Sequence, residues 1–220
     1  MIEVQWLGHA CFRLKAREGI VVTDPYGPET GLRLGRPTAH IVTVSHQEAD
    51  HNHIAAVRGV RGEPFVIQGP GEYEIGGIFI LGVRTYRDMR RGRVRGKNTA
   101  YVIEFEEATF CHLGDLGHPL DDEELEEIGS VDVLMVPVGG KHSLDASQAA
   151  EVVAQIEPRI VIPMHYALPG LRLRLDGVEP FLHEMGVKPA APLDMLRLTP
   201  GDLPSEEEET RVVVLRPAGE

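Results

Sequence analysis

The sequence lacks several features that define common protein classes. No apolar run approaches the ~18 residues of a membrane-spanning helix, and the first residues do not combine a basic start with an apolar stretch. We therefore expect neither a membrane anchor nor a signal peptide. Positive charge is also scarce, because 34 acidic residues face 22 basic ones and leave a formal net charge of −12. This deficit argues against a protein that coats nucleic acid, since phosphates require a basic surface.

Cysteine is almost absent, with only Cys11 and Cys111, and each lies in an apolar run. We expect two buried free thiols rather than a disulfide, as in a cytoplasmic protein. At 220 residues and 42% hydrophobic content, the chain buries a sufficient core without cross-links. No internal repeat is present, and we interpret residues 1–220 as one domain. The sequence leaves open whether copies form a homo-oligomer.

Short β-branched and aromatic runs fill the first half of the chain and predict strands. These runs are residues 4–7, 11–16, 19–23, 41–45, 65–67, 73–75, 77–84 and a hairpin of 99–105 with 108–113 that turns at Glu106-Glu107. The second half predicts helices at 121–128, 146–156 and 177–185, and strands at 131–136, 160–163 and 211–216. Asp145 is the expected N-cap of the middle helix. This order predicts an α/β (α+β) protein whose sheets are flanked by helices.

Histidine and aspartate recur where the predicted strands end. The segment His46-Gln47-Glu48-Ala49-Asp50-His51 follows one strand, and Asp24 closes another. Two more strands end in His112-Leu113-Gly114-Asp115 and Pro163-Met164-His165-Tyr166. Sites in α/β proteins collect at the carboxyl ends of strands, and imidazole with carboxylate suits Zn, Mn or Fe. The pattern therefore predicts a metal site formed by several strand ends.

These motifs together resemble the metallo-β-lactamase superfamily, whose signature is His-x-His-x-Asp-His followed by a distal His, a bridging Asp and a final His. A narrower set is similar to the branch of Zn-dependent hydrolases that includes ascorbate-6-phosphate lactonase and the N-acylethanolamine-releasing phospholipases. That set is Trp6-Leu7-Gly8-His9-Ala10, Thr23-Asp24-Pro25, His112-x-Gly114-Asp115 and Pro163-Met164-His165. The resemblance extends from Val4 to about Tyr166 and implies a four-layer αββα sandwich with a dinuclear site on one edge.

The resemblance also implies a role for each matching residue. The implied ligands of a first ion are His46 and His112, those of a second ion are Asp50, His51 and His165, and Asp115 bridges the two. Zinc is the expected metal, with Mn or Fe as alternatives and one or two ions bound. A metal-bound hydroxide would then be the nucleophile. The candidate catalytic residues are Asp50, Asp115 and His9, although His9 also fits a purely structural turn.

Glu48 departs from the family pattern, because it stands where the signature has its second histidine. Two interpretations remain open. Glu48 binds the first ion through its carboxylate, or it turns away and leaves that position weak or empty.

A basic segment interrupts the acidic sequence. Between Arg84 and Lys97, seven residues are basic and only Asp88 is acidic. Such a segment would attract an anionic ligand; the alternative is a solvated hairpin tip that pairs with the protein's own acidic surface. Residues 95–99 also resemble a stretch of the same branch, which makes Arg95, Lys97 and Asn98 candidate substrate contacts.

We therefore expect a cytoplasmic metal-dependent hydrolase that cleaves a lactone, ester or phosphodiester bond of a small anionic molecule. A nucleic-acid phosphodiesterase is the first alternative, disfavoured by the net charge and by the lack of length for an added nucleic-acid domain. A metal-binding protein with little hydrolytic activity is the second alternative, and it would suit the loss of the family's second histidine.

Overall fold

The computed structural model of the chain describes residues 1–106, 108–205 and 207–218. Its first sheet has six strands in the order β14-β1-β2-β3-β5-β7. The bounds are β1 (Ile2–Gly8), β2 (Cys11–Lys15), β3 (Ile20–Thr23), β5 (Ile41–Val44), β7 (Phe65–Gln68) and β14 (Leu196–Leu198). The chain enters this sheet as an antiparallel meander and continues with parallel pairs from β3 to β7.

The second sheet has seven strands in the order β15-β13-β12-β11-β10-β9-β8. The bounds are β8 (Gly71–Ile75), β9 (Ile78–Tyr86), β10 (Lys97–Phe105), β11 (Ala108–His112), β12 (Val133–Pro137), β13 (Ile160–Met164) and β15 (Arg211–Val212). The strands β8 to β11 pair in antiparallel fashion, whereas β11, β12 and β13 are parallel because helices connect them.

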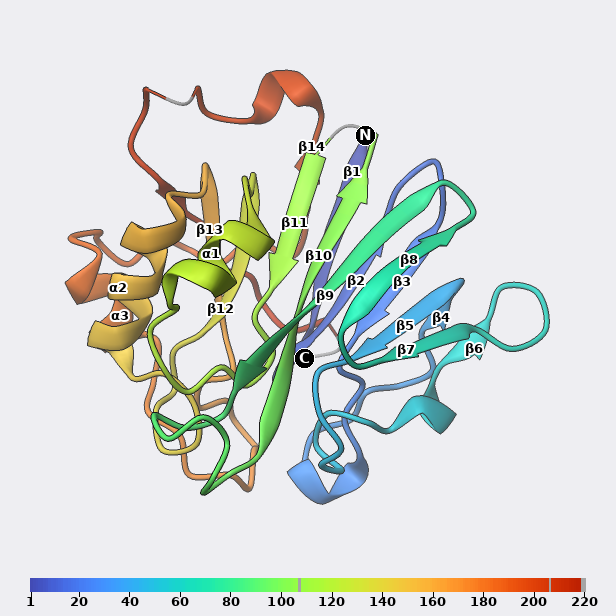
Figure 1. Ribbon diagram of the computed structural model, residues 1–220, viewed down its shortest axis with the longest axis horizontal. Coiled ribbons are helices and arrows are strands. Elements are labelled where there is room, and N and C mark those ends of the chain that lie inside the picture. The colour runs from blue at the N-terminus through green and yellow to red at the C-terminus, as the bar shows by residue number, and fades with distance from the viewer. Residues whose placement is uncertain (107, 206, 219–220) are drawn as a thin grey trace.

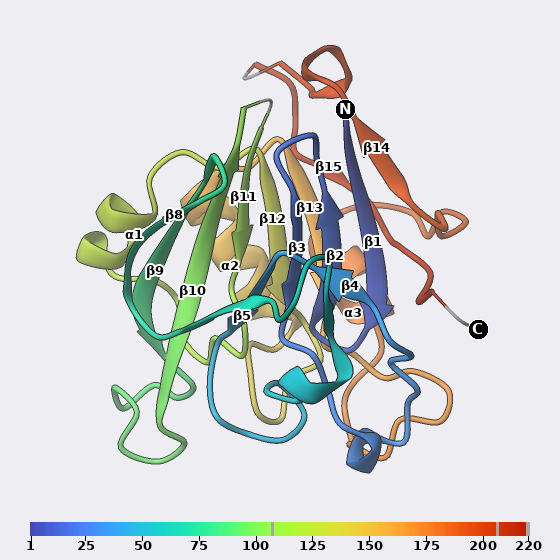
Figure 2. The ribbon, with the colours of Figure 1, turned by 90° about the vertical axis from the view of Figure 1, so that its right-hand side faces the viewer.

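The two sheets face each other, and the α-helices cover the outer side of the seven-stranded sheet (Figure 1). Figure 2 shows the six-stranded sheet in front of the strands of the other sheet. The helices are α1 (Asp122–Ile128), α2 (Ala146–Ile156) and α3 (Glu179–Glu184). Short elements complete the fold: the 3-10 turns η1 (Pro28–Thr30), η2 (Ile54–Ala56) and η3 (Pro200–Asp202), and the paired strands β4 (Thr38–Ala39) and β6 (Arg58–Gly59).

The hydrophobic core is formed by apolar residues that alternate with polar residues along strands such as β1. In β1, Ile2, Val4 and Trp6 are fully buried between the sheets, while the intervening residues are partly exposed. A second, smaller cluster lies on the outer face of the six-stranded sheet and includes Val22 and Val42. The segment that covers this cluster contains 3-10 turns rather than α-helices. The layers are those of the metallo-β-lactamase sandwich, and short turns form the fourth layer.

Most predicted elements are confirmed, with ends shifted by a few residues. The strands β4, β6 and β14 were not predicted, because each is only two or three residues long and exists through its pairing partner. The predicted hairpin turn includes Glu107, which lies outside the described residues. Cys11 and Cys111 are buried free thiols, as expected. Within the described residues, no helix combines the length and apolar character required to cross a membrane.

Tyr101 connects the two sheets near the edge where the strands end. Its ring is buried in β10, and its hydroxyl donates to the carbonyl oxygen of Val44 in β5 at 2.9 Å. The same hydroxyl oxygen accepts from the backbone N–H of Gly69 at 2.9 Å. One side chain of the seven-stranded sheet thus binds the ends of β5 and β7 in the other sheet.

We expect Tyr101→Phe to lower the free energy of unfolding by about 1–3 kcal/mol, because it leaves buried backbone groups without a partner. Tyr73→Phe is the matched control, since the Tyr73 hydroxyl lies 3.4 Å from each of its acceptors. Urea denaturation of the three proteins measures the difference. Equal stability of both variants would show that the hydroxyl does not hold the sheets together.

Candidate metal centre

Four strand ends and one turn meet at a single edge of the two sheets. His9 lies in the turn between β1 and β2, Asp24 follows β3, and His46 to His51 follow β5. Asp115 comes shortly after β11, and His165 directly after β13. His9, Asp24 and His165 have φ values of 53°, 38° and 54°, a left-handed conformation that non-glycine residues rarely adopt. Such residues cluster at functional sites.

The turn that carries His9 is fixed through its carbonyl oxygen. This oxygen accepts the indole N–H of Trp6 at 3.0 Å and the backbone N–H of His165 at 3.0 Å. Trp6 is fully buried between the sheets. The position of His9 relative to His165 is therefore set by the core and not by a flexible loop.

Asp24 orients two histidines of the segment after β5. Its carboxylate accepts from the backbone N–H of Ser45 at 2.7 Å, from the Ser45 hydroxyl at 2.6 Å, and from Nδ1 of His51 at 2.8 Å. Because the Ser45 hydroxyl donates to Asp24, it accepts from Nδ1 of His46, 3.0 Å away. Both imidazoles thereby hold a proton on Nδ1 and leave Nε2 as a potential ligand.

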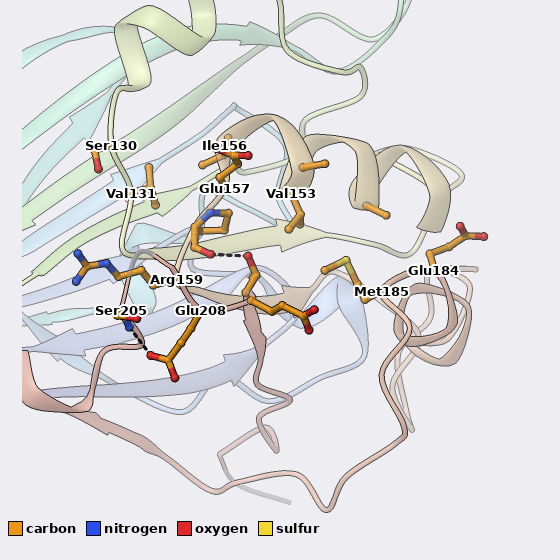
Figure 3. A pocket seen from close by; sticks show the side chains of 15 residues that line it. Ser130, Val131, Val153, Ile156, Glu157, Arg159, Glu184, Met185, Ser205 and Glu208 are labelled. Atoms are coloured by element: carbon orange, nitrogen blue, oxygen red, sulfur yellow. Dashed lines mark hydrogen bonds between the residues drawn. The ribbon is translucent and has the colours of Figure 1, made fainter.

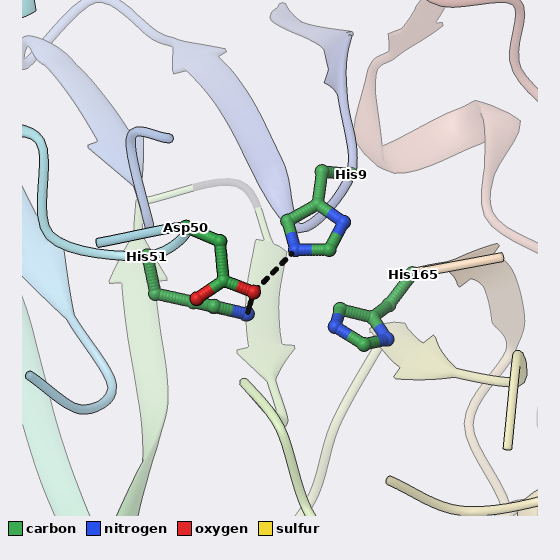
Figure 4. A group of neighbouring side chains, drawn as sticks. All are labelled: His9, Asp50, His51 and His165. Carbon is green, nitrogen blue, oxygen red and sulfur yellow. Dashed lines mark hydrogen bonds and ion pairs between the residues drawn. The ribbon is translucent and has the colours of Figure 1, made fainter. Parts of the chain in front are cut away.

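Four side chains converge on one point, as Figure 4 shows: His9, Asp50, His51 and His165. One ligand atom of each lies within 4.8 Å of the others. Asp50 Oδ2 lies 3.3 Å from His9 Nε2 and 3.7 Å from His51 Nε2. Three separate segments of the chain supply these residues.

Asp115 joins this group from the end of β11. Its Oδ1 lies 3.5 Å from His165 Nε2, and its Oδ2 lies 4.0 Å from His46 Nε2. The backbone N–H of Asp115 donates to the Asn98 side chain at 3.0 Å. Gly114 makes this turn possible, because a Cβ there would lie 2.5 Å from Ser45 Cβ.

The electrostatics of the cluster favour a bound cation. Burial opposes charge on His51, but its hydrogen bond to Asp24 and the nearby carboxylates raise the pKa of His51 to about 9. Burial, together with the charges of His51 and Arg87, lowers the pKa of His46 to about 2. Burial likewise lowers the pKa of His9 and His165. The neutral imidazoles of His9, His46 and His165 can donate lone pairs to a metal ion. The carboxylates that raise the pKa of His51 would also stabilise a metal cation bound at its Nε2.

Unpartnered atoms provide the test of whether a metal fits. Buried polar atoms are normally hydrogen-bonded. Here His46 Nε2, His51 Nε2, His165 Nε2 and Asp115 Oδ1 are buried without a hydrogen-bond partner among the described residues. All four are typical metal-ligand atoms. His51 and His165 lie in one group with His9 and the Asp50 carboxylate, and His46, His51 and Asp115 form a second group. The residues present therefore fit a divalent ion held by Asp50, His51 and His165, with Asp115 Oδ1 3.5 Å from His165 Nε2.

Glu48 points toward an arginine. Its carboxylate accepts from both Nη1 and Nη2 of Arg87, with 2.9 Å between Nη2 and Oε2. Arg87 also donates from Nε to Oδ2 of Asp115 at 2.8 Å. In the sequence, Arg87 is only one of the seven basic residues between Arg84 and Lys97. Its position just after β9, level with the other strand ends, is the signal that identifies it.

His112 is not brought into the cluster. Its Nε2 lies 2.7 Å from the carbonyl oxygen of Ala10, and its Nδ1 accepts from the backbone N–H of Gly114 at 3.3 Å. Among the described residues, the groups suited to a metal do not include it. Both ring nitrogens are engaged, so the ligand role implied for His112 does not fit these contacts; instead the ring supports the turn that leads to Asp115.

A hollow of about 470 Å³ opens beside the cluster and is lined by His46, Glu48, Arg84, Arg87, Arg95, Lys97 and Asn98, among others. The candidate contacts Arg95 and Lys97 lie at its wall. Asn98 is 1% exposed and donates to Thr85 and Leu113, so it mainly supports Asp115 from below. A larger hollow of about 880 Å³ lies elsewhere, between α2 and the residues Ser205 and Glu208–Thr210 (Figure 3). No histidine is among the described residues that line it, and we assign function to the smaller hollow.

Comparisons with known proteins agree with this architecture. The β-lactamase superfamily domain matches residues 3–165. A UPF0173 metal-dependent hydrolase of Pyrococcus horikoshii is 28% identical, covering 76% of this chain and 85% of the relative. A UPF0173 protein of Pyrococcus furiosus is 32% identical, covering 75% and 83%. A crystal structure from Thermotoga maritima, described as a candidate Zn-dependent hydrolase of the metallo-β-lactamase superfamily, has a TM-score of 0.76 and 35% identity, covering 98% and 99%.

We expect Asp24→Asn to weaken zinc binding by about 10–100-fold, because the carboxylate that orients His51 loses its charge. Titration of metal-free protein against a chromophoric chelator measures the affinity. Asp132→Asn is the control, because the Asp132 carboxylate also accepts a backbone hydrogen bond, at 2.9 Å from Thr109, but lies outside the cluster. Equal affinities of the two variants would contradict the orienting role of Asp24.

We expect His112→Phe to retain bound metal while its free energy of unfolding falls by about 1–3 kcal/mol, because Ala10 and Gly114 lose their buried partner. His165→Phe should instead lose the metal. Elemental analysis combined with urea denaturation separates the two effects. Loss of metal from folded His112→Phe protein would place His112 among the ligands.

Proposed function

The chain belongs to the metallo-β-lactamase superfamily and is a metal-dependent hydrolase; we propose that its substrate is a small anionic molecule with a lactone, ester or phosphodiester bond. We further propose zinc as the native metal. Two imidazoles and two carboxylates form a ligand set that suits zinc, and the Thermotoga maritima relative is described as Zn-dependent.

The charge of the hollow beside the cluster is the observation that carries this proposal. Four cationic side chains line it: Arg84, Arg87, Arg95 and Lys97. Glu48 neutralises Arg87, but among the described residues no carboxylate pairs with Arg84 or Lys97. On a chain with a net charge of −12, this local excess of positive charge attracts and orients an anion. The volume of about 470 Å³ suits a small molecule.

The residues in and beside the hollow would have three different roles in hydrolysis: to bind the metal, to bind the substrate and to support the metal ligands. A divalent ion bound at the cluster would supply an activated water and a charge that polarises the bond to be cleaved. Asp50, His51 and His165, with Asp115 next to them, would hold that ion beside the hollow. Arg84 and Lys97 bind the anionic part of the substrate, which turns the reactive bond toward these residues. Asp24 and Asn98 keep the ligands in place, because each bonds to a segment that carries one of them.

We expect the double substitution Arg84→Glu with Lys97→Glu to raise KM roughly tenfold for an anionic phosphodiester at low salt, because two favourable charges are reversed. The KM for a neutral ester should change little. Steady-state kinetics with bis-p-nitrophenyl phosphate and p-nitrophenyl acetate measure both values, and added salt should reduce the difference.

The control reverses charge on the loop between β9 and β10, outside the hollow. Arg90 and Arg93 are exposed and do not line it, so Arg90→Glu with Arg93→Glu should leave both KM values nearly unchanged. Equal effects of the two double substitutions, or equal effects on both substrates, would contradict the proposed anion contacts. Faster cleavage of RNA than of any small ester would favour a nucleic-acid phosphodiesterase.

A further inference from the structure

The guanidinium of Arg87 occupies the space between the carboxylates of Glu48 and Asp115. Nη1 and Nη2 bind the two oxygens of Glu48, and Nε binds Oδ2 of Asp115. Nη1 also donates to the carbonyl oxygen of Arg95 at 3.2 Å. Contacts to described residues thus use four of the five N–H groups of a side chain that is only 7% exposed. The planar guanidinium is a good match for such paired oxygens.

The same two carboxylates are the donors that a first metal ion would require. Together with His46, whose Nε2 lies 4.0 Å from Glu48 Oε2 and 4.0 Å from Asp115 Oδ2, they surround the first of the two positions that the family resemblance implies. An ion bound there would share these oxygens with the guanidinium and lie next to its positive charge. Like charges at such short range repel, and the guanidinium already occupies the carboxylate oxygens that the ion would need, so the first position does not fit a metal.

Arg87 leaves the second position open. Asp50, His51 and His165 form no hydrogen bond or ion pair with the guanidinium among the described residues, and Asp115 turns its other oxygen, Oδ1, toward His165 at 3.5 Å. The atoms without a hydrogen-bond partner include Nε2 of His46, His51 and His165 and Oδ1 of Asp115. The second position therefore needs a cation from solution, whereas the two carboxylates of the first position already pair with a cation that belongs to the chain.

The backbone holds Arg87 in this place. Its N–H donates to the carbonyl oxygen of Gly96 at 3.2 Å, across the loop that joins β9 to β10. Asp88 organises that loop by accepting from the backbone N–H groups of Arg90, Gly92, Val94 and Arg95. The loop is therefore a fixed support, and the guanidinium is already oriented before any ligand arrives.

We propose that this enzyme is a single-metal hydrolase in which Arg87 replaces the first metal ion of the dinuclear centre. Glu48 and Arg87 then differ together from the dinuclear pattern: the Glu48 carboxylate neutralises the Arg87 guanidinium, which takes the place of the ion. Arg87 positions Asp115 for the remaining metal and presents a permanent positive charge at the wall of the hollow. This inference rests on the metal centre of the proposed function but not on the proposed substrate.

The test is the number of zinc ions bound in the absence of substrate. Metal-free protein is incubated with excess zinc, desalted and measured by elemental analysis and native mass spectrometry. We expect one equivalent for the wild type and two for the double variant Glu48→His with Arg87→His, which removes the internal cation and restores imidazole donors. With Mn²⁺, electron paramagnetic resonance should show an isolated ion in the wild type and an exchange-coupled pair in the double variant.

The control combines Glu48→His with Arg90→His on the exposed part of the same loop, and it should remain at one equivalent because Arg87 is intact. Two ions in the wild type would overturn the proposal, and this result requires no variant to fold. A double variant that keeps the first zinc, and is therefore folded, but accepts no second one would also overturn it. Absence of zinc from every protein would instead contradict the metal centre itself and both proposals with it.

Discussion

The buried carboxylate of Asp24 is the interaction on which the rest of the site depends. It lies at the end of β3, has a left-handed backbone conformation, and binds both Ser45 and His51. Through these contacts it ties the first residues after β5 to the neighbouring strand and fixes which ring nitrogen of His51 carries a proton. Burial raises and the bond to His51 lowers the pKa of Asp24, which settles at about 2. The carboxylate is thus ionised, and a cation nearby is favoured.

Stability and function compete at this edge of the molecule. Several buried atoms with lone pairs face one another without hydrogen-bond partners, and leaving such groups unpaired costs folding free energy. A rigid framework keeps them together: Trp6 holds the turn of His9, and Tyr101 links the two sheets close by. A bound metal ion would relieve this cost, because binding to the folded state alone stabilises it. Metal binding and folding are therefore coupled here.

The positive charge beside Asp115 and Glu48 comes from a side chain of the protein, the guanidinium of Arg87. Asp115 and Glu48 need positive partners once they are placed close together, and either an ion or a guanidinium satisfies them. The guanidinium is permanent and directional, whereas an ion exchanges with solution and accepts additional ligands. A site that combines the two keeps one exchangeable position for chemistry and one fixed charge for geometry. The basic wall of the hollow continues from this fixed charge toward Arg84 and Lys97.

The sequence by itself determined where most strands and helices lie along the chain and the identity of most candidate ligands. Alternating apolar residues mark strand β1, a nearly continuous buried run marks β10, and the residues that follow Thr23, Val44 and Met164 mark the strand ends where candidate ligands gather. These signals are local, because a few consecutive residues are enough to show the apolar pattern of a strand and the position where it ends. The tertiary structure alone decided three things: that Arg87 meets Glu48, that His112 turns to the backbone of Ala10, and that Arg84 and Lys97, rather than Arg90 and Arg93, line the hollow. The first two depend on contacts between residues that are distant along the chain, and the third depends on which part of the β9–β10 hairpin faces the site. No short stretch of sequence encodes either kind of information.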